Sequence, residues 1–78
     1  MNREIVNFIC RRQNVPAETI QPDSHLIIDL GLTSLDLMEL ALAMEERYGI
    51  EINVQDTVDL ETVEKISLYI DSLAVSAG

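Results

Sequence analysis

Residues 29–40 read DLGLTSLDLMEL, a short glycine-containing segment followed by the beginning of an amphipathic helix. Thr33 is followed three residues later by Asp36, a pair that resembles the capping box of helix N-termini. If Thr33 is the N-cap, Ser34 is the first helical residue. Its hydroxyl then lies at the positive end of the helix dipole, where a phosphate is favourably placed. The spacing alone also allows Ser34 to be no more than a residue that suits a helix start.

The helix predicted from this start spans residues 34–48 and ends before Gly49, a residue type common just after helix ends. Its helical wheel has two apolar stripes. The first predicts packing against the core and contains Leu37, Leu40, Ala41, Met44 and Tyr48. The second stripe, bordered by acidic side chains, contains Leu35, Met38 and Leu42. Either the preceding loop covers this second stripe, or the stripe is exposed as a docking surface for another protein.

The rest of the chain adds two further helices. The spacing of apolar residues predicts helices over residues 2–12 and 61–73, and a short helical turn is expected over 55–60 after an extended connector. Residues 14–32 form a connection whose length indicates a functional loop. Four of its apolar residues are expected to pin it to the core: Leu26, Ile27, Ile28 and Leu30. The predicted fold is a small all-α bundle.

Composition narrows the classes of function. The chain has 78 residues, which suffice for one domain over 1–78, and its limits at Met1 and Gly78 indicate a protein that stands alone. Its 14 acidic and 5 basic residues give a net charge of -9, which repels nucleic acids and anionic membranes and favours a partner with a basic face. The longest apolar run, Leu40–Met44, is far shorter than the roughly 20 residues of a membrane span. Cys10 is the single cysteine, which fits a cytoplasmic protein without disulfides.

Other kinds of site fit the sequence poorly. An EF-hand loop needs acidic residues at its first, third and fifth positions and glycine at its sixth, and neither Asp29 nor Asp56 begins such a pattern. His25 could bind a metal together with Asp23 and Asp29, but a single histidine in a polar loop is usually solvent-facing. No nucleophile is evidently paired with a base, so the chain is not expected to be an enzyme.

Taken together, the segments resemble the acyl carrier proteins and the related peptidyl carrier domains. The resemblance centres on Asp29–Asp36 and Glu39-Leu40 and covers nearly the whole chain, with further matches at Val15-Pro16, Ile20–Ser24, Leu26, Glu45–Ile52 and Thr62-Val63. It implies a four-helix bundle with a long first loop and a short third helix. It also implies that Ser34 is esterified by 4′-phosphopantetheine, which a phosphopantetheinyl transferase transfers from coenzyme A. The thiol of this arm carries acyl groups as thioesters.

The resemblance further implies that the helix after the serine is the docking surface for partner enzymes. The transferase and the enzymes that load and process acyl groups are expected to present basic faces to it, and the carrier is expected to be a monomer. The docking residues implied are Thr33, Leu35, Asp36, Met38, Glu39, Leu42 and Glu46. The cargo stays open between fatty acyl, polyketide and aminoacyl groups.

Two residues depart from the family pattern. Thr33 stands where the family most often has aspartate, and Asn53 stands where it often has proline. Threonine still offers an oxygen that can cap the helix, whereas the missing negative charge alters what a transferase can recognise. Both departures indicate a specialised carrier over the housekeeping fatty-acid carrier. The alternative function is an unmodified acidic helical module that binds other proteins without a phosphopantetheine arm.

Overall fold

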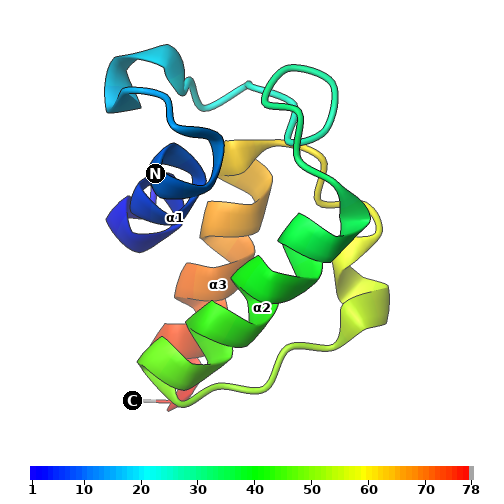
Figure 1. The fold of residues 1–78 in the computed structure, drawn as a ribbon. Coiled ribbons are helices and arrows are strands. Elements are labelled where there is room, and N and C mark those ends of the chain that lie inside the picture. Colours follow the sequence, from blue (N-terminus) through cyan, green and yellow to red (C-terminus); the bar gives the residue numbers. More distant parts are fainter. Residues whose placement is uncertain (78) are drawn as a thin grey trace.

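The computed structural model describes residues 1–77, apart from the side chains of residues 54, 76 and 77. Its regular elements, in chain order, are α1 (Arg3–Gln13), the 3-10 turn η1 (Ala17–Thr19), α2 (Ser34–Tyr48), the 3-10 turn η2 (Val54–Thr57) and α3 (Val63–Ala77). Each α-helix contacts the other two. Figure 1 shows α2 and α3 side by side, with the loop between α1 and α2 passing over the end of the bundle where α2 and α3 begin.

The all-α prediction is confirmed, since residues 1–77 contain no β-strand and only an isolated bridge between His25 and Thr62. Within these residues three α-helices form the fold, and the fourth helix implied by the resemblance is not among them. The helical turn expected over residues 55–60 is the 3-10 turn η2, which begins one residue earlier and ends before Leu60. None of the helices described is long and apolar enough to cross a membrane.

The core is aliphatic and draws on all three helices and the loops between them. Ile5 and Ile9 come from α1, and both are fully buried because they lie one helical turn apart on the same face. The remaining buried apolar side chains are Ile20, Leu26, Leu32, Leu40, Met44, Ile52, Val63, Ile66 and Ile70. Cys10 is half-buried and packs against this core, as expected for a small apolar side chain.

Asn2 links the start of α1 to the end of α2 and to the middle of α3. Its Oδ1 accepts hydrogen bonds from the backbone N–H groups of Glu4, at 2.8 Å, and Ile5, at 3.2 Å, and so caps α1. Its Nδ2 donates to Asp71 Oδ1 of α3 at 2.7 Å and to Tyr48 Oη of α2 at 3.2 Å. Asn2 is buried, and these bonds satisfy its polar atoms while fixing the start of α1 against the other two helices.

The loop that leads to α2 is held by Leu26 and Leu32, which are almost completely buried. The prediction that Ile27 and Ile28 also pin it is wrong, because the exposed fractions of these residues are 49% and 79%. The reason is a tight turn: Leu32 N–H donates to the Leu26 carbonyl at 3.0 Å, so the intervening residues project outward.

His25 is partly exposed, and it also has a structural role in this turn. Its Nδ1 accepts hydrogen bonds from the backbone N–H groups of Ile27 and Ile28, both at 3.1 Å. Its own N–H donates to Asp29 Oδ2 at 2.7 Å. Among the described residues, no cluster of three or more histidine, cysteine or acidic side chains could hold a metal.

Candidate functional site

The first turn of α2 is fixed by a reciprocal pair of hydrogen bonds. Asp36 N–H donates to Thr33 Oγ1 at 3.1 Å, and Thr33 N–H donates to Asp36 Oδ2 at 2.9 Å. Thr33 has extended backbone geometry and is the N-cap, so the predicted capping box is confirmed. At the other end, Gly49 adopts the left-handed conformation with φ of 63° and terminates the helix as predicted.

Ser34 is therefore the first residue of α2, as the capping pattern predicts. It is exposed, and within residues 1–77 its hydroxyl has no hydrogen-bond partner. The first-turn N–H groups of a helix lack intrahelical partners and make its N-terminus favourable for negative charge. The Ser34 hydroxyl is thus accessible to an enzyme, and a phosphate joined to it would lie in this favourable field.

The loop that presents Ser34 is tied to both α1 and α3. Gln13 Nε2 at the end of α1 donates to the Leu30 carbonyl at 2.8 Å. On the other side, Leu26 N–H donates to the Glu61 carbonyl at 2.8 Å, just before α3. Gly31 has a φ of 71°, and an added Cβ there would lie 3.3 Å from Gln13 Nε2. A glycine suits this position both for its backbone conformation and for the space beside it.

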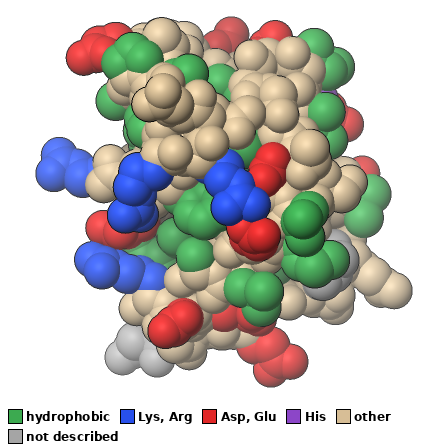
Figure 2. Space-filling view, viewed as in Figure 1, with side chains coloured by type: hydrophobic (Ala, Val, Ile, Leu, Met, Phe, Trp, Pro, Cys, Tyr) green, Lys and Arg blue, Asp and Glu red, His purple; other side chains and the backbone are tan. Residues whose placement is uncertain are grey.

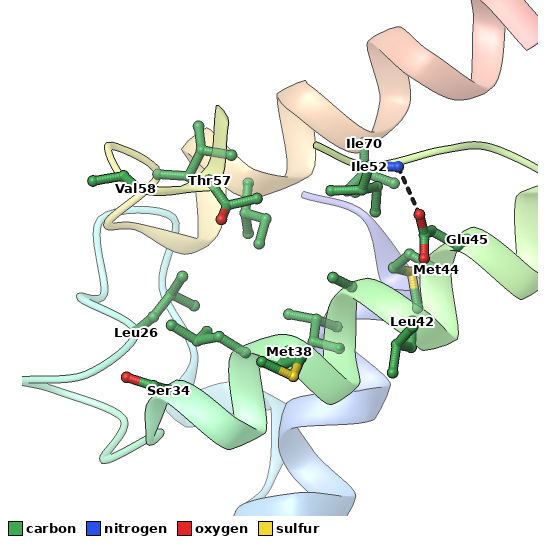
Figure 3. Close-up of a pocket in the computed structure, with 15 residues that line it drawn as sticks. Leu26, Ser34, Met38, Leu42, Met44, Glu45, Ile52, Thr57, Val58 and Ile70 are labelled. Atoms are coloured by element: carbon green, nitrogen blue, oxygen red, sulfur yellow. Dashed lines mark hydrogen bonds between the residues drawn. The ribbon is translucent and has the colours of Figure 1, made fainter. Parts of the chain in front are cut away.

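A cavity of about 320 Å³ begins beside Ser34 and extends along α2. Figure 3 shows Ser34 and Leu26 at one end and Ile52 and Ile70 at the other, with Thr57 and Val58 on the opposite side of the opening from α2. Apart from Ser34, Glu45 and Thr57, the lining side chains are apolar: Leu26, Leu37, Met38, Leu40, Ala41, Leu42, Met44, Ile52, Val58, Leu60, Ile66 and Ile70. At the far end, Glu45 Oε2 accepts a hydrogen bond from Ile52 N–H at 2.8 Å and holds the connector against α2.

The second apolar stripe of α2 faces outward. The exposed fractions of Leu35, Met38 and Leu42 are 60%, 55% and 59%. The alternative in which the preceding loop covers this stripe is therefore wrong. Three large apolar side chains left in water on one helix form a surface suited to contact with another protein.

The acidic residues beside this stripe are not all available to a partner. Arg12 of α1 binds both Asp36 and Glu39, with Arg12 Nε 2.7 Å from Asp36 Oδ1. The Thr33 N–H hydrogen bond, and after it the one from Arg12, hold the pKa of the Asp36 carboxyl below its ordinary value. Sequence reasoning placed both acids correctly at the start of α2 but missed Arg12. The spacing of Asp36 and Glu39 in the sequence does not reveal that a cation from another helix pairs with them.

We expect Thr33→Ala to lower the free energy of unfolding by about 1 kcal/mol, because alanine cannot accept the hydrogen bond from Asp36 N–H. Thr33→Ser keeps the accepting oxygen and is the matched control. The measurement is the denaturant midpoint of the three proteins. An alanine variant as stable as the wild type would remove the capping role of Thr33.

Comparison of the sequence with known proteins identifies a family of carrier proteins. The sequence model of the family described as "Phosphopantetheine attachment site" matches residues 3–70. The acyl carrier protein of Nitratidesulfovibrio vulgaris is 39% identical over 70 residues, which cover 90% of this chain and 92% of that protein. The acyl carrier proteins of Syntrophobacter fumaroxidans and Campylobacter hominis are 37% and 34% identical over 70 residues, covering 90% of this chain and 86% and 89% of theirs.

The chain thus belongs to the phosphopantetheine-attachment family, and its relatives place it among the acyl carrier proteins. It is a carrier, not an enzyme, and 4′-phosphopantetheine is the group that such a domain holds covalently. The residues described fit this group, because an exposed serine with an unpartnered hydroxyl stands at a capped helix start beside an apolar cavity.

Proposed function

We propose that Ser34 is the residue that is esterified by 4′-phosphopantetheine. The observation that carries this proposal is the exposed, unpartnered Ser34 hydroxyl at the first position of α2. Ser24 and Ser67, by contrast, are buried and unsuited to an enzyme's approach. The arm at Ser34 extends from one end of the bundle, which leaves its thiol able to reach partner active sites.

The attachment reaction uses coenzyme A and a phosphopantetheinyl transferase. Ser34 Oγ attacks the phosphorus that bears the pantetheine, and a new ester bond forms between them. The bond from that phosphorus to the bridging oxygen of the diphosphate breaks, and adenosine 3′,5′-bisphosphate leaves. The serine proton goes to a base of the transferase, since the described residues place no histidine, aspartate or glutamate in a hydrogen bond with the Ser34 hydroxyl.

The cavity beside Ser34 favours a hydrocarbon cargo. Its volume of about 320 Å³ is at the lower end of the roughly 300–1,000 Å³ of ligand pockets, and its lining is almost wholly apolar. A short fatty acyl or polyketide chain would be stabilised by burial in this apolar cavity. A charged aminoacyl group would instead lose its hydration on entering, which costs free energy. We therefore propose acyl chains of the fatty-acid or polyketide kind as cargo.

We further propose that partner enzymes dock on the exposed stripe of Leu35, Met38 and Leu42. The surrounding docking residues are Thr33, Asp36, Glu39 and Glu46, and they favour partners with basic faces. We propose that the protein acts as a monomeric single domain in the cytoplasm. In this assignment η2 stands where the family's four-helix bundle has its short third helix.

The proposed attachment is tested by intact-mass measurement after incubation with coenzyme A and a transferase of broad specificity. We expect the mass to rise by one phosphopantetheine group, and fragmentation of the peptide that contains residues 29–40 should locate it on Ser34. An unchanged mass, or a group located on another residue, would contradict the assignment.

We expect Met38→Glu to raise the KM of the transferase for this carrier, because a carboxylate replaces an apolar contact at the centre of the stripe. Its effect on the free energy of unfolding should stay within about 0.5 kcal/mol, since Met38 is 55% exposed. Leu68→Glu is the matched control, because Leu68 is 62% exposed on α3 and lies outside the stripe. Equal KM values for the two variants would place docking elsewhere.

A further inference from the structure

Arg12 occupies the two carboxylates of α2 that are nearest to Ser34. Its Nε lies 2.7 Å from Asp36 Oδ1, and its Nη2 contacts Glu39 Oε2. The exposed fractions of the three side chains are 36% for Arg12, 14% for Asp36 and 39% for Glu39. The bridge therefore lies at the surface, within reach of another protein. In Figure 2 cationic side chains gather on the α1 side of the molecule, and one of them lies against acidic side chains.

Of the two remaining acidic residues of α2, one is engaged by a hydrogen bond among residues 1–77 and the other is not. Glu45 is engaged by the Ile52 N–H group at 2.8 Å. Glu46 is exposed, and no ion pair or hydrogen bond engages its carboxylate within the described part of the chain. Of the four carboxylates on α2, one is thus available to a basic partner without breaking an existing contact.

The hydrogen bond between Arg12 and Asp36 favours the charged forms of both side chains. The pKa of the Arg12 guanidinium is raised above its ordinary value, chiefly by its hydrogen bond to Asp36. An ion pair at the surface contributes little net stability, because water solvates the separated charges well. The bridge can therefore open when a partner enzyme supplies a competing charged side chain. Breaking it should affect partner binding more than the free energy of unfolding.

We propose that Arg12 is a specificity-determining residue that competes with basic partner enzymes for Asp36 and Glu39. A partner that presents lysine or arginine side chains must displace Arg12 before it can pair with these acids. The displaced guanidinium then repels the same basic face. Arg12 thereby weakens docking by partners that rely on positive charge alone, and favours partners that also present a carboxylate for it. This inference rests on the proposed attachment at Ser34 and docking along α2.

The test compares Arg12→Gln with Arg11→Gln as transferase substrates. Each substitution removes one positive charge from a chain whose net charge is -9. Arg11 is exposed and next in sequence, but it takes part in no ion pair among residues 1–77. We expect the KM of Arg12→Gln to be about two- to fivefold lower than that of Arg11→Gln, because only the former releases Asp36 and Glu39. In about 1 M salt, where the Debye length falls to about 3 Å, the difference should disappear.

A double-mutant cycle with Glu39→Gln supplies a second readout. In the wild-type background Arg12 already engages Glu39, so Glu39→Gln should raise KM by a smaller factor than it does when Arg12 is absent. In the Arg12→Gln background the carboxylate is released, and the same substitution should raise KM. If Arg12 only stabilises the fold, the effect of Glu39→Gln on KM should not depend on the residue at position 12. Arg12→Gln alone would then raise KM rather than lower it.

The outcomes separate this inference from the proposed function. A wild-type protein that is not modified on Ser34 contradicts the proposed function and this inference together. A modified wild type, with Arg12→Gln no better a substrate than Arg11→Gln, overturns the role of Arg12 alone. Circular dichroism of each variant verifies that the comparison is made between folded proteins.

Discussion

Replacing Ser34 with alanine is expected to abolish the coenzyme A-dependent gain in mass completely and to leave the helical content unchanged. The loss is complete because alanine has no oxygen with which to form the phosphate ester. The fold should survive because the capping hydrogen bonds at the start of α2 come from Thr33 and Asp36, not from Ser34. Alanine is also the residue with the highest helix propensity. Intact mass after treatment with the transferase, together with far-ultraviolet circular dichroism, measures both effects.

Ser72→Ala is the control for this experiment. Ser72 is an exposed serine of α3, away from the start of α2, and its replacement should leave the mass gain as in the wild type. Modification that persists in Ser34→Ala would assign the arm to another residue. Loss of modification together with loss of helical signal would instead indicate that the substitution had disturbed the fold.

The ends of α2 could be predicted because their signals are local. Thr33 and Asp36 are three residues apart, and their side chains and backbone groups meet as soon as one helical turn forms. Gly49 ends the helix for an equally local reason, since it adopts a left-handed conformation at little cost. The position of Ser34 follows from these signals without any knowledge of the tertiary structure.

The exposure of the second stripe could not be predicted in the same way. The helical wheel shows that α2 has two apolar stripes, but the path of the preceding loop decides which of them meets water. Leu26 and Leu32 turn into the core, and the hydrogen bond between their backbones directs Ile27 and Ile28 outward. A run of apolar residues in a loop does not reveal this alternation before the turn is known.

Long-range polar contacts were beyond sequence reasoning altogether. Arg12 and Asp36 are 24 residues apart, and Asn2 and Asp71 are 69 residues apart. Each pair forms only because the α-helices pack at particular angles. Counting charges along the chain identifies an acidic α2 but overestimates the charge that it offers, because α1 supplies a cation to two of its carboxylates.

Leu40→Ala and Leu42→Ala change the same residue type two positions apart on α2, but we expect the first to reduce stability and the second to reduce docking. Leu40 is 1% exposed and packs in the core, whereas Leu42 is 59% exposed. Truncating a buried leucine costs about 2–5 kcal/mol through lost burial and the cavity left behind. A domain below about 80 residues has roughly 3–5 kcal/mol of net stability, so Leu40→Ala should leave a large fraction of the protein unfolded.

Leu42→Ala should change the free energy of unfolding by no more than about 0.5 kcal/mol, since the side chain is largely in water already. Its effect should appear in docking, as a higher KM for the transferase, because the exposed stripe loses one of its three large apolar contacts. Urea denaturation gives the stabilities, and initial modification rates over a range of carrier concentrations give KM. Similar losses of stability in both variants would mean that the stripe belongs to the core. A Leu42→Ala protein with wild-type stability and wild-type KM would mean that the transferase does not read this position.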